Sequence, residues 1–293
     1  MISIIIPLYN KENSIANTIQ SILDQTFQDF EIVVVDDGST DDSVTIVERY
    51  ADNRIRIIQK ENGGVSSARN RGIEEANYEY IAFLDADDYW EPTYLKELVK
   101  LIHDFPNAGL YGLGFGYMWQ ENKESINHDL PDLFRGIIEN PWQRGCIYWT
   151  GSSTTTTKTV IQSVGLFDER MSHGEDLDMW YRILLNYQGV FYNQTLAYYR
   201  QDAENRAMNN VIPFEKHLPF FIEKYTEYRQ NNQDFRRYFD LQCLYRLYPY
   251  VLMPKYRKDL HRVLKQIDFS HQKLSMRLRF MFPRWYNLYL KIK

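Results

Sequence analysis

The sequence predicts an α/β protein: a mostly parallel sheet flanked by helices, with a C-terminal helical extension. Two patterns support this fold class. Apolar runs of strand length alternate with amphipathic segments at helical spacing through the first third of the chain, and only helical spacing continues beyond residue 205. With 293 residues, of which 44% are hydrophobic, the chain can form one large domain with an appendage. We therefore expect a first domain over residues 1–205 and a helical extension over 206–293.

Four apolar runs are expected to form the core of the sheet, and they cover residues 2–6, 31–35, 55–59 and 80–84. The segments that separate them have apolar residues at helical spacing: 15–23, 44–50 and 65–76. A further helix is expected after Pro92, which suits a first helical turn. Right-handed crossovers make such neighbouring strands parallel, so their carboxyl ends meet at one edge, where open α/β sheets bind ligands.

An acidic stretch lies at that edge. Asp85, Asp87 and Asp88 directly follow the run 80–84, and their mutual repulsion costs free energy unless a cation, a donor or water offsets it. The signatures of dinucleotide and P-loop phosphate binding are missing from the sequence. An Asp-x-Asp pair supplies hard oxygen ligands for Mg²⁺ or Mn²⁺, which can bridge carboxylates to a diphosphate. A solvated acidic turn that caps the next helix would have the same sequence, so both interpretations stay open here.

Composition argues against several other classes. The N-terminal residues MISIIIPLYN lack a basic leader, and their apolar run is too short for a signal peptide, so we expect a cytoplasmic protein. Cys146 and Cys243 are far apart and the six histidines lack metal-site spacing, so neither a disulfide nor structural zinc is expected.

Charge is distributed unevenly along the chain. From Pro254 onward there are eleven Lys or Arg and two Asp, a net charge of +9, and the other 23 basic and 37 acidic residues leave −14. The last stretch, RLRFMFPRWYNLYLKIK, mixes basic and large apolar side chains, which suits attraction to an anionic membrane surface. A basic helix packed on the acidic body would explain the pattern almost as well. Nucleic acid is not an expected partner, because the body is acidic and lacks nucleic-acid motifs.

Five motifs occur in a characteristic order: Pro7-Leu8-Tyr9-Asn10, Val35-Asp36-Asp37-Gly38-Ser39, Asn62-Gly63-Gly64 with Ala68-Arg69-Asn70-Arg71-Gly72, Leu84-Asp85-Ala86-Asp87-Asp88, and Gly174-Glu175-Asp176. In this order they resemble the family 2 nucleotide-sugar glycosyltransferases, which are inverting enzymes of the GT-A fold, a Rossmann-like architecture. The resemblance covers roughly the first two thirds of the chain and ends near Arg200.

The resemblance implies a donor site at the first two strand ends. Pro7 and Tyr9 would lie at the nucleotide, with the Tyr9 ring stacked on the base. Asp37 would accept the imide hydrogen of that base, which in the family is usually uracil. From the residues alone, Tyr9 could equally be a rim aromatic and Asp37 the first residue of a tight turn into Gly38.

The resemblance also implies a diphosphate and metal site. Asp85 would lie by the ribose and diphosphate, Asp87 would hold Mn²⁺ or Mg²⁺, and the Arg69 guanidinium would lie close to the phosphates, unless it is a solvated helix-face charge. One departure affects this site. Many relatives have Tyr-Arg-x-His where this chain has Tyr199-Arg200-Gln201-Asp202, so either Asp202 replaces that histidine as a metal ligand or the role is absent.

Transfer with inversion needs a base for the acceptor hydroxyl, and the stretch HGEDLDMWYRILL supplies candidates. Read as a helix, it places Asp176 on the inward face with Trp180, while Glu175 lies to one side and Asp178 pairs with Arg182 on the exposed side. In the family the acid of this Glu-Asp pair serves as the base, which indicates Asp176, with Glu175 as second choice. An N-terminal cap is the structural alternative for Asp176.

Residues that contact the acceptor are less evident. Trp119, Trp142 and Trp149 could stack on a sugar ring or belong to the core, and the run 152–157 is expected to be a strand near the site.

The sequence thus predicts an inverting, metal-dependent glycosyltransferase of the hexosyltransferase type. It would transfer a sugar, from a UDP-sugar donor, to a glycan or lipid-linked oligosaccharide in surface polysaccharide or lipopolysaccharide synthesis, in the cytoplasm or at the inner membrane face. The alternatives are a nucleotidyltransferase, which would release pyrophosphate, and a non-catalytic nucleotide-sugar-binding scaffold.

Overall fold

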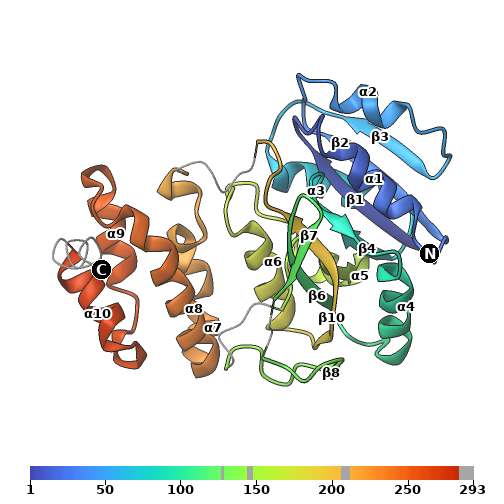
Figure 1. Cartoon of the computed structure of the whole chain (residues 1–293). Helices are drawn as coiled ribbons and strands as arrows, with labels where there is room; N and C mark the ends of the chain where they lie inside the picture. Colours follow the sequence, from blue (N-terminus) through green and yellow to red (C-terminus); the bar gives the residue numbers. More distant parts are fainter. Residues whose placement is uncertain (127–128, 144–147, 206–211, 284–293) are drawn as a thin grey trace. The chain divides into compact units, whose positions relative to one another are not determined.

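The computed structural model describes residues 1–126, 129–143, 148–205 and 212–283 (Figure 1). The chain divides into two compact units: Met1–Pro141 with Cys146–Val211, and Trp142–Gly145 with Ile212–Lys293. The first unit contains the sheet and its helices, and the second is helical in its described part. The expected boundary at 205/206 adjoins residues 206–211, which lie outside the described residues.

Four parallel strands form one half of the sheet, in the order β3-β2-β1-β4. Their bounds confirm the four predicted runs: β1 (Ile2–Leu8), β2 (Phe30–Asp36), β3 (Ile55–Gln59) and β4 (Tyr80–Phe83). Every residue of β2 is buried, as is typical of a parallel strand covered on both faces.

The other half of the sheet is mixed. β9 (Thr154–Thr157), predicted from the run 152–157, pairs antiparallel with β4 and with β6 (Leu110–Trp119). β6 runs parallel to β10 (Gly189–Arg200), and β5 (Tyr89–Trp90) closes that edge antiparallel to β10. Two short strands, β7 (Asn122–Ser125) and β8 (Arg135–Ile137), pair antiparallel with β6 and β10. The sheet is therefore parallel where the βαβ units occur and mixed beyond them.

Helices cover both faces of the sheet (Figure 1). Because side chains alternate along a strand, Ile4 and Ile6 of β1 pack in one core and Ile5 in the other. The first core includes apolar side chains of α1 (Ile15–Leu23), α2 (Ser43–Glu48) and α4 (Tyr94–Asp104). The second core includes those of α3 (Val65–Glu75), α5 (Lys158–Val164) and α6 (Glu175–Leu184).

The second unit has its own aromatic core. Phe214, Tyr225, Phe235 and Phe239 are completely buried, and the ring centroids of Tyr225, Phe235 and Phe239 lie 4.6 to 5.8 Å apart. Its α-helices are α7 (Thr226–Asn231), α8 (Gln233–Leu247), α9 (Arg257–Leu264) and α10 (Leu274–Met281). The 3₁₀ helices are Phe214–Lys216, Leu218–Tyr225, Tyr248–Tyr250, Pro254–Tyr256 and Phe269–His271. In the described parts of the chain, no helix combines the length and the hydropathy that a membrane span requires.

Candidate active site

The carboxyl ends of β1, β2 and β4 meet at one edge of the sheet, as the βαβ pattern predicts. The Asp37 main-chain N–H donates to the Leu8 carbonyl at 2.8 Å, and that of Leu84 donates to the Ile5 carbonyl at 3.1 Å. These bonds extend the strand pairing to the residues that follow each strand. Pro7, Asp37 and the acidic stretch after β4 are therefore neighbours.

Asp37 organises one side of this edge, the side on which the motifs predict the nucleotide (the nucleotide side). Its carboxylate is only 4% exposed and accepts three hydrogen bonds: from the Gly63 N–H (2.9 Å), the Gly64 N–H (2.7 Å) and Lys60 Nζ (2.6 Å). Gly64 has a φ of 88°, a conformation that favours glycine. Asp37 thus holds the loop before α3 and keeps one acceptor site on Oδ2.

Tyr9 lies on the rim of the same side, with 41% of its surface exposed. The next residue, Asn10, has a φ of 50° and joins the loops after β1 and β2. Its N–H donates to Ser39 Oγ at 3.1 Å, and its Oδ1 accepts from the Thr40 N–H at 2.8 Å. These contacts fix the backbone beside Tyr9, whose ring is left accessible to a flat ligand.

The other side of the edge holds the acidic stretch after β4 together with Glu175 and Asp176 (the acid side), and Arg69 lies at its centre. Its side chain is 4% exposed, and its two terminal nitrogens contact two carboxylates, Asp85 at 2.8 Å and Glu175 at 2.9 Å. Burial alone would lower the pKa of Arg69, but Asp85, Glu175 and Asp176 together raise it above its ordinary value. The alternative of a solvated helix-face charge is therefore wrong, because α3 turns this residue inward toward the two acids.

The structure corrects the expected positions of the Glu-Asp pair. Glu175 is the buried residue, at 8% exposure, while Asp176 is half-buried. The reason is the Arg69 guanidinium on α3, which offers Glu175 a buried cation. Burial and the neighbouring Asp176 raise the pKa of Glu175 to about 7, although Arg69 opposes the shift. Asp176 Oδ1 accepts a hydrogen bond from the Leu177 N–H at 2.7 Å.

A second correction concerns Asp178 and Arg182. They do form the predicted ion pair, at 2.9 Å, but Asp178 is completely buried and the Arg182 side chain is 11% exposed. Arg182 also donates to the main-chain carbonyls of Val164, Gly165 and Leu166. The pair is therefore internal and fastens the end of α5 to α6, which single-helix periodicity could not reveal.

The acidic stretch after β4 is crowded: Asp88 is buried, and Asp85 and Asp87 are half-buried. Asp88 Oδ2 accepts from Ser152 Oγ at 2.5 Å and its Oδ1 from the Arg200 N–H at 3.2 Å. Asp87 contacts Lys11 Nζ at 2.6 Å. Burial, and then the neighbouring carboxylates, raise the pKa of Asp88 well above its ordinary value. Burial also raises the pKa of Asp87, although Lys11 opposes this. Such a stretch favours a bound cation.

The donor set fits a hard divalent ion only in part. Asp85 and Asp87 offer carboxylate oxygens, and a diphosphate could supply further ligands. Within the described ranges, however, no group of three or more Asp, Glu, His or Cys residues could hold a metal by itself. Asp202 accepts from the Gln120 N–H at 3.2 Å and lies 3.9 Å from Arg200 Nε, and both of these partners lie outside the acidic stretch. Its role as a ligand stays a prediction.

Sequence reasoning missed several residues of the site. Lys11 and Lys60 each contact a predicted site acid, and the Tyr199 hydroxyl accepts from the Ser152 N–H at 3.4 Å. Gly151 is also close: a Cβ there would lie 3.2 Å from Arg69 Nη2 and 3.3 Å from Asp85 Oδ2. The glycine therefore leaves space over that ion pair. Two of these residues had a signal in the sequence: Lys11 is adjacent to the first motif, and Tyr199 belongs to the Tyr-Arg-Gln-Asp stretch.

The three tryptophans considered for the acceptor differ. Trp149 and Trp142 are 3% and 8% exposed, and Trp142 packs on Phe235 in the second unit, so both are core residues. Trp119 is 57% exposed at the end of β6, so an acceptor role stays a prediction for it.

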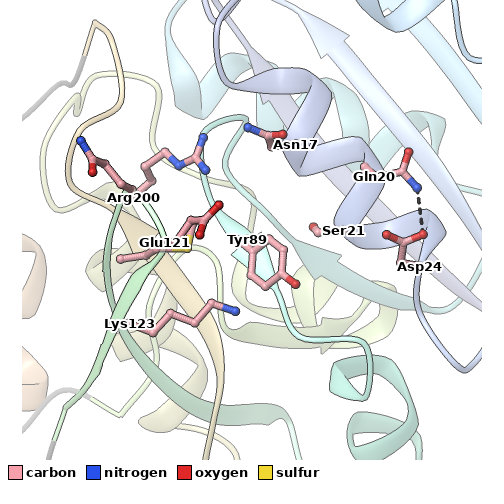
Figure 2. Close-up of a pocket in the computed structure, with 10 residues that line it drawn as sticks. Asn17, Gln20, Ser21, Asp24, Tyr89, Glu121, Lys123 and Arg200 are labelled. Carbon is pink, nitrogen blue, oxygen red and sulfur yellow. Dashed lines mark hydrogen bonds between the residues drawn. The ribbon is translucent and has the colours of Figure 1, made fainter.

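A polar cavity of about 330 Å³ lies beside that strand end, lined by α1, Tyr89, the β6–β7 turn and Arg200 (Figure 2). The Arg200 side chain faces this cavity, whereas its main chain contacts Asp88.

Known proteins resemble this chain in sequence and in fold. The family model described as glycosyl transferase family 2 matches residues 3–162. An uncharacterized glycosyltransferase of Rickettsia typhi is 30% identical over 78% of this chain and 73% of its own length. The putative glycosyltransferase EpsH of Bacillus subtilis is 42% identical over 46% of this chain and 39% of its own.

Among solved structures, S. aureus TarS in complex with UDP-GlcNAc has a TM-score of 0.76 at 20% identity, covering 98% of this chain and 88% of that one. This similarity agrees with the GT-A fold expected from the motifs. Since the family model spans more than half of the chain, the protein belongs to family 2 of the glycosyl transferases.

Proposed function

We propose that this chain is an inverting, metal-dependent glycosyltransferase that transfers a sugar from a uridine diphosphate donor to a glycan or lipid-linked oligosaccharide. The observation that carries the proposal is the Asp85–Arg69–Glu175 arrangement, next to Asp176 and at the same sheet edge as Asp37. It brings residues of three sequence motifs together, and a reaction between a bound donor and a catalytic base requires such proximity.

The donor half of the proposal rests on chemistry at two points. The Asp37 carboxylate retains an acceptor site for the imide N–H of uracil, and the exposed Tyr9 ring offers a stacking surface. Arg69 presents a guanidinium whose planar geometry suits phosphate oxygens. The UDP-GlcNAc bound in TarS, a protein of similar fold, supports a uridine diphosphate sugar as the donor class.

The base half rests on the contrast between the two acids of α6. Glu175 is held by Arg69, whereas Asp176 is half-buried. Asp176 would take the proton of the acceptor hydroxyl as its oxygen bonds to the anomeric carbon. The bond from that carbon to the diphosphate breaks on the opposite side, so the configuration inverts and UDP leaves. Asp85 and Asp87 would hold Mn²⁺ or Mg²⁺, which supplies charge neutralisation for the leaving diphosphate.

Thermal-shift measurement with nucleotides tests the donor site. Uridine, guanosine, cytidine and thymidine diphosphates are compared, each with Mn²⁺, Mg²⁺ or a chelator. A ligand that binds only the folded state raises the melting temperature, so UDP with metal is expected to give the largest increase. A larger increase with another nucleotide would refute the uridine assignment, and an equal increase in chelator would refute metal dependence.

The reaction products separate the proposal from its alternatives. With a UDP-sugar and an acceptor, a glycosyltransferase releases UDP. A nucleotidyltransferase would instead release pyrophosphate from a nucleoside triphosphate and a sugar phosphate, and a scaffold would release neither product. We place the reaction in surface polysaccharide or lipopolysaccharide synthesis, on the inner face of the membrane, because a lipid-linked acceptor would be met there.

Part of the second unit supports a membrane contact. Leu274, Leu278 and Met281 recur at helical spacing on α10 and are 69%, 40% and 66% exposed, with Lys273, Arg277 and Arg279 on the same segment. An apolar stripe with basic neighbours favours anionic bilayers. The rest of the basic tail, residues 284–293, lies outside the described residues. Cosedimentation with phosphatidylglycerol vesicles should exceed that with phosphatidylcholine vesicles. Equal sedimentation of wild type and a Leu274→Ser, Met281→Ser double variant would contradict the contact.

A further inference from the structure

The cation at Asp87 is a side chain of the protein itself. Lys11 Nζ lies 2.6 Å from Asp87 Oδ2, and the two side chains are only 12% and 16% exposed. A single ammonium on a carboxylate that is largely shielded from solvent compensates its charge at close range, which makes this pair different from an exposed ion pair. Lys11 therefore occupies the position in which the proposed divalent ion would meet Asp87.

The same ammonium has further oxygen contacts. It donates to the main-chain carbonyls of Glu204 at 2.7 Å and Asn205 at 3.3 Å. The Glu204 carboxylate in turn accepts from the Asn13 N–H at 2.9 Å and from Ser14 Oγ at 2.5 Å. One carboxylate and two carbonyl oxygens thus surround the charge of Lys11. All three are hard oxygen ligands of the kind that divalent ions also prefer.

We infer that Lys11 and the divalent cation compete for Asp87, so that Lys11 sets how tightly the site binds metal. The inference rests on the proposed function and deepens it, because it adds a positioning residue to the donor site. The ammonium stabilises Asp87 without metal, and the cation must displace it. Displacement also costs the contacts with residues 204 and 205. Metal affinity in this chain is therefore weaker than the carboxylates alone would allow.

The test measures Mn²⁺ binding by the electron paramagnetic resonance signal of free Mn²⁺, with the full chain and saturating UDP. Lys11→Met is expected to bind Mn²⁺ about tenfold more tightly than wild type, a typical coupling between two competing ligands. The matched control is Lys123→Met, which removes an ammonium whose ion pair, at 2.6 Å, is with Glu91 and not with Asp87. Its Mn²⁺ affinity is expected to stay at the wild-type value.

A second variant separates direct competition from a general loss of positive charge. In an Asp87→Asn background, Lys11→Met should no longer change Mn²⁺ affinity if Lys11 acts through that carboxylate. Melting temperature gives an independent readout: without metal Lys11→Met should melt below wild type, and Mn²⁺ should reduce the difference.

Three results would overturn the inference: unchanged or weaker Mn²⁺ binding in Lys11→Met, the same gain in both backgrounds, or no Mn²⁺ binding by any variant. The first two results concern Lys11 alone and leave the proposed glycosyl transfer to its own test through Asp176→Asn. The third would also contradict the metal dependence of the proposed function.

Discussion

The two sides of the active site treat their carboxylates differently. On the nucleotide side, the Asp37 carboxylate accepts hydrogen bonds from two main-chain N–H groups and one ammonium, which fix its position. On the acid side, burial raises the pKa values of Glu175, Asp87 and Asp88, and Arg69 and Lys11 offset the charge of Glu175 and Asp87 only in part. On the first side, hydrogen bonds within the protein already hold the carboxylate and the loop around it. The second side holds excess negative charge, which a cationic ligand would relieve.

The largest expected effect is a loss of catalytic rate on the acid side. Asp176→Asn should lower the transfer rate by about 10² to 10⁴-fold, the usual range for losing a general base, while UDP binding changes little. Steady-state UDP release and a UDP titration measure the two effects. Glu175→Gln serves as the comparison, because it changes the neighbouring acid. Wild-type turnover in Asp176→Asn would remove this residue from the mechanism and favour Glu175.

The next effect concerns stability on the acid side. Arg69→Met should cost about 3–5 kcal/mol in free energy of unfolding, since it leaves Asp85 and Glu175 without their shared cation. Arg71→Met on the same helix is the control. The Arg71 side chain is 46% exposed and pairs with Glu74 and Glu75, so its loss should cost less than about 1 kcal/mol. Urea denaturation measures both, and similar losses would deny that the acid side depends on a buried cation.

The pH dependence of stability tests the raised pKa of Glu175 on the acid side. The pKa of Glu175 is raised from 4.5 to about 7 in the folded state, so the folded protein binds more protons than the unfolded chain between these values. The stability from protonated Glu175 is therefore fully present below pH 4.5 and is lost as pH rises through about 7. Relative to Glu175→Gln, wild type should lose up to about 3 kcal/mol over this interval. Parallel stability curves of the two proteins would contradict the raised pKa.

The smallest expected effect lies on the nucleotide side. Asp37→Ala leaves the Gly63 and Gly64 N–H groups without their acceptor, which should cost about 1–3 kcal/mol of stability and weaken UDP binding. Asp42→Ala is the control. Asp42 is exposed and makes no side-chain cap bond at the start of α2, so its replacement should change stability by no more than about 0.5 kcal/mol. Thermal denaturation with and without UDP measures both. Equal values for the two variants would mean that Asp37 does not organise the loop.

The sequence by itself determined the four parallel strands, the sheet edge on which Asp37 and Asp85 meet, and the family motifs. Each of these depends on local periodicity or on fixed spacing, which a linear chain records directly. The fold of the second unit was determined only as helical, and its 3₁₀ segments were not foreseen.

Only the tertiary structure decided which basic side chain pairs with which carboxylate. Arg69 binds Glu175 across 106 residues, Lys11 binds Asp87 across 76, and Lys60 binds Asp37 across 23. Periodicity on α6 made Asp176 the inward acid and Asp178 an exposed one. The structure buries Glu175 and Asp178 instead, because α3 supplies the cation to Glu175 and Arg182 pairs with Asp178 beneath the end of α5. Burial of a charge depends on a partner from another element, and one segment's sequence does not specify that partner.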